Sequence, residues 1–158
     1  MQLYFLRHGL ADWPDWDPNQ DHTRPLTKEG VKKMKATAKV IAQLDLKLDA
    51  ILSSPFTRAL QTADIVAGQL KLDATEEAAL APGFNLERLG DIVTRYSSAK
   101  ALMLVGHEPG FSMTIHEIIG GGRVVLKKGG LARVDVTSLD PLSGQLIWLL
   151  PPKMLSMQ

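Results

Sequence analysis

The order of apolar segments along the chain is the feature that most constrains its fold. Short apolar runs at residues 2–6, 49–53 and 101–105 alternate with longer segments in which apolar residues recur every three or four positions. Short runs of this kind are typical of buried strands, and the longer spacing is typical of helices. Strands that alternate with helices favour a parallel sheet covered on both faces. We therefore predict an α/β fold, a three-layer α/β/α sandwich with a mostly parallel central sheet.

Capping residues indicate where the helices begin. Thr27 is the expected N-cap of a helix over 28–44, and Ser54, followed by Pro55, is the expected N-cap of a helix that runs to about Leu70. The other predicted elements are helices at 85–96 and 110–119 and strands at 72–76, 124–127, 131–137 and 145–150. We expect a loose tail from Pro151, and a functional role for the long polar loop at 10–26.

Length and composition narrow the class of protein. A chain of 158 residues fits a single domain over residues 1–158. The formal net charge of +1 provides no overall field for nucleic acid or an anionic membrane, so neither is an expected partner. The absence of cysteine excludes disulfides and thiolate chemistry and fits a cytoplasmic protein. The N-terminus lacks a secretory signal pattern, and no apolar run is long enough to cross a bilayer.

Polar residues follow three of the predicted strands. Arg7, His8 and Gly9 come directly after the first strand, Arg58 follows the second, and His107 and Glu108 follow the strand at 101–105. Sites in α/β sheets lie at the carboxyl ends of the strands, so we expect these side chains to converge.

Two arginines and two histidines in one pocket suit a phosphoryl group. Guanidinium groups match pairs of phosphate oxygens, and a neutral imidazole can attack phosphorus to give a phosphohistidine. Nearby arginines would depress the pKa of the histidine and keep it neutral. This chemistry requires no metal and no cofactor. The chain also lacks the glycine-rich Lys-Ser/Thr loop of nucleotide-driven motors.

Four segments carry a family resemblance. They are Leu6-Arg7-His8-Gly9, the segment RPLTKEG at 24–30, the segment SSPFTRALQTA at 53–63, and VGHEP at 105–109. In order and spacing they resemble the motifs of the histidine phosphatase (phosphoglycerate mutase-like) superfamily. The short chain and the His-Glu-Pro form of the last motif resemble the SixA-type phosphohistidine phosphatase branch most.

The resemblance implies a role for each matching residue. His8 would be the nucleophile, and Arg7, Arg58 and His107 would form the phosphate pocket. We also predict Gly9 and Glu108 among the phosphate-binding residues. Gly9 would allow a tight turn and orient His8 through its carbonyl. A phosphoenzyme would form and then be hydrolysed by water.

The sequence does not identify a general acid. The position where many relatives carry a glutamate falls on Ala79, and we expect Glu76 and Glu77, two or three residues away, to lie at the surface. Asp21 resembles a loop aspartate of SixA-type proteins, and it is either an acid/base residue or a loop cap. A phosphohistidine protonated on its free ring nitrogen leaves as neutral imidazole, whereas an alkyl phosphate needs a positioned acid. A missing acid would therefore favour N–P substrates.

Three functions remain open at this level. The first is a phosphatase acting on a phosphorylated histidine-containing protein, and the second is a phosphatase acting on small phosphorylated molecules. The third is a phosphate-binding module with weak catalysis. Trp13 and Trp16 would either form a wall for a ring-bearing substrate or pack the 10–26 loop. The oligomeric state is not predicted.

Overall fold

The computed structural model describes residues 1–156, and six strands of this part form one mixed sheet in the order β3-β2-β4-β1-β5-β6. The strands are β1 (Gln2–Arg7), β2 (Ala50–Ser53), β3 (Ala74–Glu76), β4 (Ala101–Gly106), β5 (Leu131–Leu139) and β6 (Leu142–Leu150). Strands β1 to β4 are parallel to one another. At one edge, β5 pairs antiparallel with β1, and β6 pairs antiparallel with β5. The predicted α/β fold with a mostly parallel sheet is confirmed.

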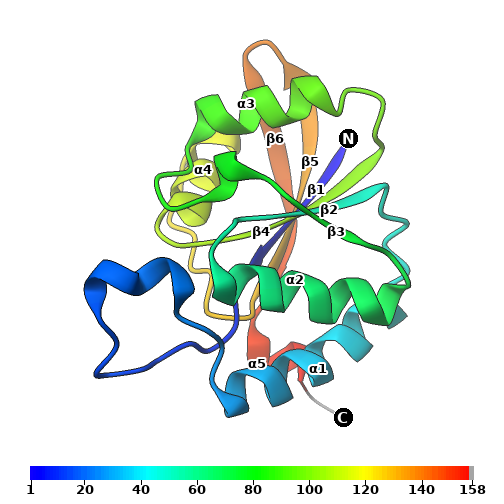
Figure 1. Cartoon of the computed structure of the whole chain (residues 1–158). Helices are drawn as coiled ribbons and strands as arrows, with labels where there is room; N and C mark the ends of the chain where they lie inside the picture. The colour runs from blue at the N-terminus through cyan, green and yellow to red at the C-terminus, as the bar shows by residue number, and fades with distance from the viewer. Residues whose placement is uncertain (157–158) are drawn as a thin grey trace.

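Helices cover both faces of the sheet, which gives the predicted three layers (Figure 1). On one face lie α1 (Lys28–Gln43), α2 (Thr57–Leu70) and the short α5 (Pro152–Leu155); on the other lie α3 (Leu86–Arg95) and α4 (Gly110–Ile118). Two 3-10 helices, η1 (Pro18–Thr23) and η2 (Ala78–Leu80), complete the fold. In the described part of the chain, no helix is both long and apolar enough to cross a membrane.

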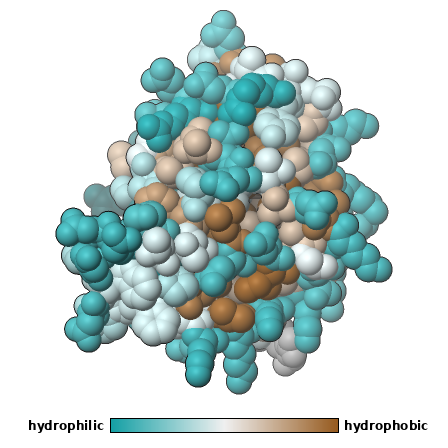
Figure 2. Space-filling model, in the orientation of Figure 1, coloured by the Kyte–Doolittle hydropathy of each residue, from teal (hydrophilic) through white to brown (hydrophobic). Residues whose placement is uncertain are grey.

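The alternation of side chains along β1 builds two separate cores. Leu3 and Phe5 pack with α3 and α4, whereas Tyr4 and Leu6 pack with α1, α2 and α5. Successive residues of a strand point to opposite faces, so one apolar run serves both layers. The surface is correspondingly polar: Figure 2 shows hydrophilic side chains over most of the visible face and a small apolar area over α2.

Three predicted elements differ from the structure. The second helix begins at Thr57 rather than at Pro55, and its N-cap is Phe56 rather than Ser54, because the Ser54 hydroxyl accepts a bond from the Phe56 N–H in a turn before the helix. Residues 124–127 form no strand, since the Leu126 carbonyl accepts from the Arg7 side chain instead of from a neighbouring strand. The expected loose tail contains α5, which buries Leu155 completely. Residues 157–158 of that tail lie outside the described part.

The 10–26 loop is tied to the start of α1 and to α2. The Leu10 carbonyl accepts from the Thr27 N–H at 2.9 Å, and the Gln61 side chain accepts from the Leu26 N–H at 2.7 Å. Thr27 caps α1 as expected, bonding the Gly30 N–H at 2.9 Å. Gly30 faces the loop so closely that a Cβ there would lie 2.2 Å from the Leu10 oxygen. The loop therefore requires glycine at this position of α1.

We predict that Gly30→Ala destabilises the protein by about 1–3 kcal/mol, because the added methyl group forces backbone apart. Gly68→Ala is the matched control: Gly68 lies in α2 with no atom within 4 Å of an added Cβ. That change should be neutral or should stabilise by up to about 1 kcal/mol. Urea denaturation of the two variants and the wild type measures both effects. A Gly30→Ala variant as stable as Gly68→Ala would contradict the packing of the loop.

Candidate active site

The parallel register of β2, β4 and β1 brings the predicted residues to one edge of the sheet. Arg7 pairs with Gly106, and Ser53 pairs with Val105. The ladder continues one residue past each strand: the His8 N–H donates to the Gly106 carbonyl at 3.1 Å, and the Ser54 N–H donates to the Val105 carbonyl at 2.9 Å. Arg7-His8, Ser54 and His107 therefore leave adjacent strand ends.

His8 is buried, neutral and held in one tautomer. Its Nδ1 lies 2.7 Å from the Gly9 carbonyl, and because a carbonyl only accepts, Nδ1 carries the hydrogen. The lone pair is then on Nε2, which accepts from Arg58 Nε at 3.3 Å. Burial lowers the pKa of His8 to about 3; the bond to Gly9 opposes this shift, and the charges of His107, Arg58 and Arg7 add to it. At neutral pH His8 therefore offers an unprotonated Nε2.

Gly9 supports His8 through close packing. Its N–H donates to Thr62 Oγ1 at 3.1 Å, and that hydroxyl donates to the Arg58 carbonyl at 2.8 Å. A Cβ at Gly9 would lie 2.7 Å from Cγ of Met34. The chain can turn against α1 and α2 here because this residue has no side chain.

Arg58 comes from the first turn of α2 and is 5% exposed. Besides its bond to His8, it donates from Nη1 to the Asp21 carbonyl at 2.9 Å and from Nη2 to the Asp21 carboxylate at 3.1 Å. Burial lowers the pKa of Arg58, and the charge of Asp21 opposes that shift. The ring of Phe56 lies 5.2 Å from the guanidinium carbon and covers it. Asp21 thus compensates a buried cation and fixes its orientation.

Asp21 itself is held as a carboxylate. It accepts from Arg24 Nε at 3.0 Å as well as from Arg58, and Arg24 also donates to the Ala11 carbonyl. Partial burial would raise the pKa of Asp21, but the bonds and charges of Arg24 and Arg58 keep it below its usual value. In this arrangement Asp21 can accept a proton or position Arg58, and it holds no proton to donate at neutral pH.

Arg7 is anchored by the segment before β5. Its Nη1 donates to the Leu126 carbonyl at 3.0 Å. The Gly129 N–H lies 3.1 Å from the Arg7 carbonyl and 3.0 Å from the His8 carbonyl, and the Arg7 N–H donates to Gly130 at 3.1 Å. Residues 126–130 therefore hold Arg7 and His8 in place.

His107 completes the cluster and is 5% exposed. Its ring lies 5.2 Å from the ring of His8 and 5.2 Å from the ring of Phe56, measured between centroids. Nε2 is 2.7 Å from Ser54 Oγ. Burial lowers the pKa of His107 to about 4, and the Arg58 charge acts in the same direction. Both histidines of the cluster are therefore neutral at pH 7.

Two buried nitrogen atoms of this cluster have no hydrogen-bond partner among residues 1–156. They are Arg7 Nε and His107 Nδ1; the third such atom, Thr114 Oγ1, belongs to α4. Buried polar groups in folded proteins are nearly always bonded, so an unpartnered pair calls for an explanation. An oxyanion accepts from guanidinium and imidazole N–H groups and would satisfy both. The cluster could therefore hold an oxyanion such as phosphate.

The acidic residues near the site are engaged elsewhere. Glu108 accepts from the Ser112 N–H at 2.8 Å and so bonds the first turn of α4. Glu77 pairs with Arg95 at 2.8 Å, and only 11% of its side chain is exposed. The surface position expected for Glu77 is therefore wrong, because this side chain also caps η2, whereas Glu76 is exposed as expected.

Sequence reasoning missed three contributors to the site: Ser54, Phe56 and Thr62. All three lie in the quoted segment at 53–63, from which only Arg58 was assigned a role. The sequence spacing could have indicated Thr62, because a residue four positions after Arg58 lies on the same side of a helix. The contacts of Ser54 and Phe56 with His107 depend on the pairing of β2 with β4, which local sequence does not reveal.

The tryptophans of the 10–26 loop bond within the loop. The Trp13 indole donates to the Pro25 carbonyl at 2.8 Å, and the Trp16 indole donates to the Gln20 carbonyl at 2.9 Å. The two rings lie 6.2 Å apart. These contacts support the packing alternative, in which the indoles hold the loop together.

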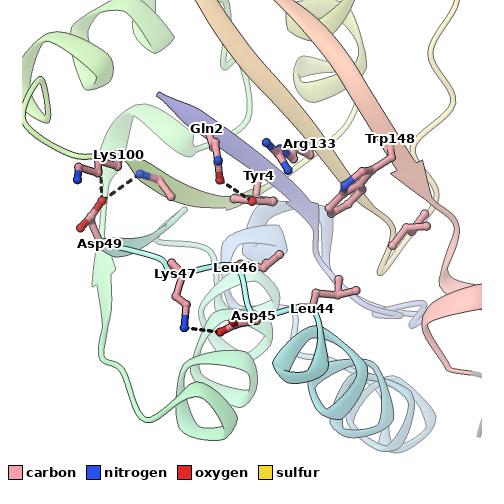
Figure 3. A pocket seen from close by; sticks show the side chains of 12 residues that line it. Gln2, Tyr4, Leu44, Asp45, Leu46, Lys47, Asp49, Lys100, Arg133 and Trp148 are labelled. Carbon is pink, nitrogen blue, oxygen red and sulfur yellow. Dashed lines mark hydrogen bonds and ion pairs between the residues drawn. The ribbon is translucent and has the colours of Figure 1, made fainter.

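A cavity of about 820 Å³ lies at the opposite end of the sheet, where β1 and β4 begin (Figure 3). Its walls include Tyr4 and Trp148, whose rings are 5.9 Å apart. Most of its charged groups already have partners: Lys47 with Asp45, Arg133 with Asp135, and Asp49 with the backbone of Lys100 and Ala101. The buried, unpartnered nitrogen atoms of Arg7 and His107 therefore distinguish the cluster around His8 from this cavity.

Known proteins resemble this chain in sequence and in fold. A family model described as the histidine phosphatase superfamily (branch 1) matches residues 3–82. An uncharacterised protein of Picosynechococcus is 37% identical over 138 residues, which cover 83% of this chain and 82% of that protein. Phosphohistidine phosphatase SixA of Escherichia coli is 34% identical over 77 residues, which cover 49% of this chain and 46% of SixA. A structure of the protein histidine phosphatase SixA complexed with tungstate superimposes with a TM-score of 0.84 at 23% identity, covering 97% of this chain and 98% of that one.

We predict that the protein loses stability as the pH falls from 6.5 towards 4. The folded-state pKa values of His8 and His107, about 3 and about 4, lie below the ordinary value of 6.5, so the unfolded chain takes up these protons first. Each histidine should remove up to about 1.4 kcal/mol per pH unit in this range. Urea denaturation at several pH values measures the loss, and His8→Gln should make it shallower. Equal stability at pH 6.5 and pH 4.5 would contradict neutral burial of the pair.

Proposed function

The chain belongs to the histidine phosphatase superfamily, and from this premise we propose that it hydrolyses phosphohistidine on a protein, through a covalent intermediate on His8. One observation carries the proposal. A buried histidine presents the lone pair of Nε2 beside Arg58, and unpartnered buried nitrogen atoms of Arg7 and His107 belong to the same cluster. A nucleophile and an oxyanion site are the two parts that phosphoryl transfer requires.

In the first step Nε2 of His8 attacks phosphorus in line with the leaving group. A new N–P bond forms as the substrate N–P bond breaks, and the electron pair of that bond goes to the departing imidazole. The substrate ring carries a proton on its other nitrogen, so it leaves neutral. The phosphorylated His8 ring becomes cationic, and the Gly9 carbonyl, bonded to Nδ1–H, stabilises that charge. Arg7, Arg58 and His107 bind the phosphoryl oxygens.

In the second step water attacks the phosphoryl group. The N–P bond to His8 breaks, and its electron pair returns to Nε2, which regenerates the neutral Nδ1–H tautomer. The proton lost by the water stays with the phosphate product. His8 therefore needs no proton from a general acid in either step.

The state of the carboxyl groups supports an N–P substrate over an alkyl phosphate. An alkoxide leaving group needs a proton from a positioned acid, whereas a protonated phosphohistidine does not. Asp21 is held deprotonated by Arg24 and Arg58, and Glu77 is paired with Arg95. In our proposal Asp21 acts by orienting Arg58. Glu108, with its bond to Ser112, acts beside the phosphate pocket by fixing the start of α4.

The remaining parts of the proposal concern partners and metals. The arginines supply the positive charge that the transferred group needs, so the reaction as proposed uses no metal. The proposed substrate is a phosphorylated histidine-containing protein, and the similarity to the phosphohistidine phosphatase SixA supports this choice. The cytoplasmic location expected from the lack of cysteine stays a prediction.

We predict an acid-labile, alkali-stable phosphoenzyme on His8. Protein quenched during turnover of a ³²P-labelled phosphohistidine protein should retain label, and His8→Ala should retain none and lose more than about 1,000-fold in rate. His116→Ala is the matched control, since His116 is an exposed histidine of α4 bonded to the Gly122 carbonyl. It should label like the wild type. Undiminished turnover by His8→Ala would overturn the mechanism.

We predict a substrate preference that follows leaving-group chemistry. The value of kcat/KM for a phosphohistidine protein should exceed that for glycerol phosphate by at least about 100-fold, the usual contribution of an acid. Excess chelator should change neither value. Faster turnover of glycerol phosphate would favour a small-molecule phosphatase, phosphate binding without turnover would favour a binding module, and loss of activity in chelator would contradict the metal-free proposal.

A further inference from the structure

The environment of Ser54 determines where the proton of His107 lies. Ser54 is fully buried, and its hydroxyl oxygen has two partners: the Phe56 N–H at 3.2 Å and His107 Nε2 at 2.7 Å. Phe56 can only donate, so it occupies one lone pair of the hydroxyl oxygen. The hydroxyl hydrogen still needs an acceptor, and among residues 1–156 the only acceptor bonded to it is His107 Nε2.

The alternative proton arrangement leaves the serine unsatisfied. If Nε2 carried the hydrogen, it would donate to Ser54 Oγ, and the hydroxyl hydrogen would have no acceptor in a fully buried place. A buried donor without a partner carries its full desolvation penalty. The hydroxyl therefore donates to Nε2, and in the neutral ring the hydrogen of His107 lies on Nδ1.

This places a donor where the structure has an unpartnered atom. His107 Nδ1 is the buried nitrogen without a hydrogen-bond partner, and its ring lies 5.2 Å from the ring of His8. An Nδ1–H can donate to an oxyanion, whereas a bare Nδ1 would face it with a lone pair and repel it. The tautomer thus decides whether His107 binds or opposes a phosphoryl group.

We propose that Ser54 is a positioning residue that fixes His107 as the neutral Nδ1–H tautomer, so that Nδ1–H donates to the phosphoryl oxygens. The inference rests on the proposed function for the identity of the oxyanion. It gives the two histidines the same tautomer for different purposes. In His8 a carbonyl holds Nδ1–H and leaves Nε2 free to attack, and in His107 a hydroxyl holds Nε2 and leaves Nδ1–H free to donate.

The pKa of His107, lowered by burial to about 4, agrees with this inference. At pH 7 the ring carries a single hydrogen, so its two nitrogen atoms cannot both donate. A serine that accepted from His107 would leave the pocket without this donor.

The test reads the tautomer directly. Long-range ¹H–¹⁵N correlation spectra of the ¹⁵N-labelled protein at pH 7, assigned with His107→Gln, report which ring nitrogen is protonated. The expected result is a protonated Nδ1 in the wild type. A wild-type ring protonated on Nε2 would overturn the inference, and this measurement needs no variant of Ser54 to fold.

Binding of tungstate, followed by calorimetry, tests the consequence. Ser54→Ala should shift His107 away from the Nδ1–H form and weaken tungstate binding by about 10- to 100-fold, the usual effect of losing a partner that orients a histidine. Ser54→Thr keeps the hydroxyl and should restore both properties. Ser53→Ala is the matched control, because Ser53 is equally buried but bonds the Ser54 carbonyl. Wild-type tungstate affinity in a folded Ser54→Ala would overturn the role of the donor.

The same experiments separate this inference from the proposed function. A wild type that has the Nδ1–H tautomer and binds tungstate, but does not hydrolyse phosphohistidine, would overturn the function and support the tautomer. A wild type that hydrolyses phosphohistidine with His107 protonated on Nε2 would overturn the inference alone.

Discussion

The parallel pairing of β2, β4 and β1 is the constraint on which the site depends. Arg7 stands opposite Gly106, and Ser53 stands opposite Val105, so His8, His107 and Ser54 all follow the ladder at the same level. A slip of one residue would turn each side chain to the other face of the sheet. The two apolar cores, which draw on alternate residues of β1, exclude such a slip because it would exchange their contents.

Burial sets the protonation state of the two histidines. Desolvation keeps both histidines neutral at pH 7, and the nearby guanidinium groups reinforce the effect. Removing Arg58 from water is costly unless its charge is compensated, and Asp21 compensates it from the 10–26 loop. The loop is held in turn by Arg24 and by the close approach of Leu10 to Gly30. The electrostatics of the site therefore depend on the packing of the 10–26 loop.

Hydrogen bonds determine which ring nitrogen of each buried histidine carries the hydrogen. A neutral imidazole has one donor and one acceptor, and its neighbours decide which faces a ligand. The Gly9 carbonyl fixes the hydrogen of His8 on Nδ1, and in our inference the Ser54 hydroxyl fixes the hydrogen of His107 on Nδ1. Under the proposed function, one histidine of the pocket would attack phosphorus and the other would bind the phosphoryl oxygens.

The sequence by itself determined the α/β class and most of the element positions, because hydrophobic periodicity is a local property. Its short motifs also singled out Arg7, His8, Arg58 and His107, which the structure brings together. The sequence placed the N-cap of α2 at Ser54, expected a strand at 124–127 and expected Glu77 at the surface, and the structure differs at each of these positions. The local sequence around Ser54 is typical of a helix N-cap. Its contact with His107 forms only because β2 pairs with β4. The same holds for Asp21, whose partners Arg24 and Arg58 are three and 37 residues away. Tertiary structure decided these roles, since proton positions and pKa values depend on neighbours that are distant along the chain.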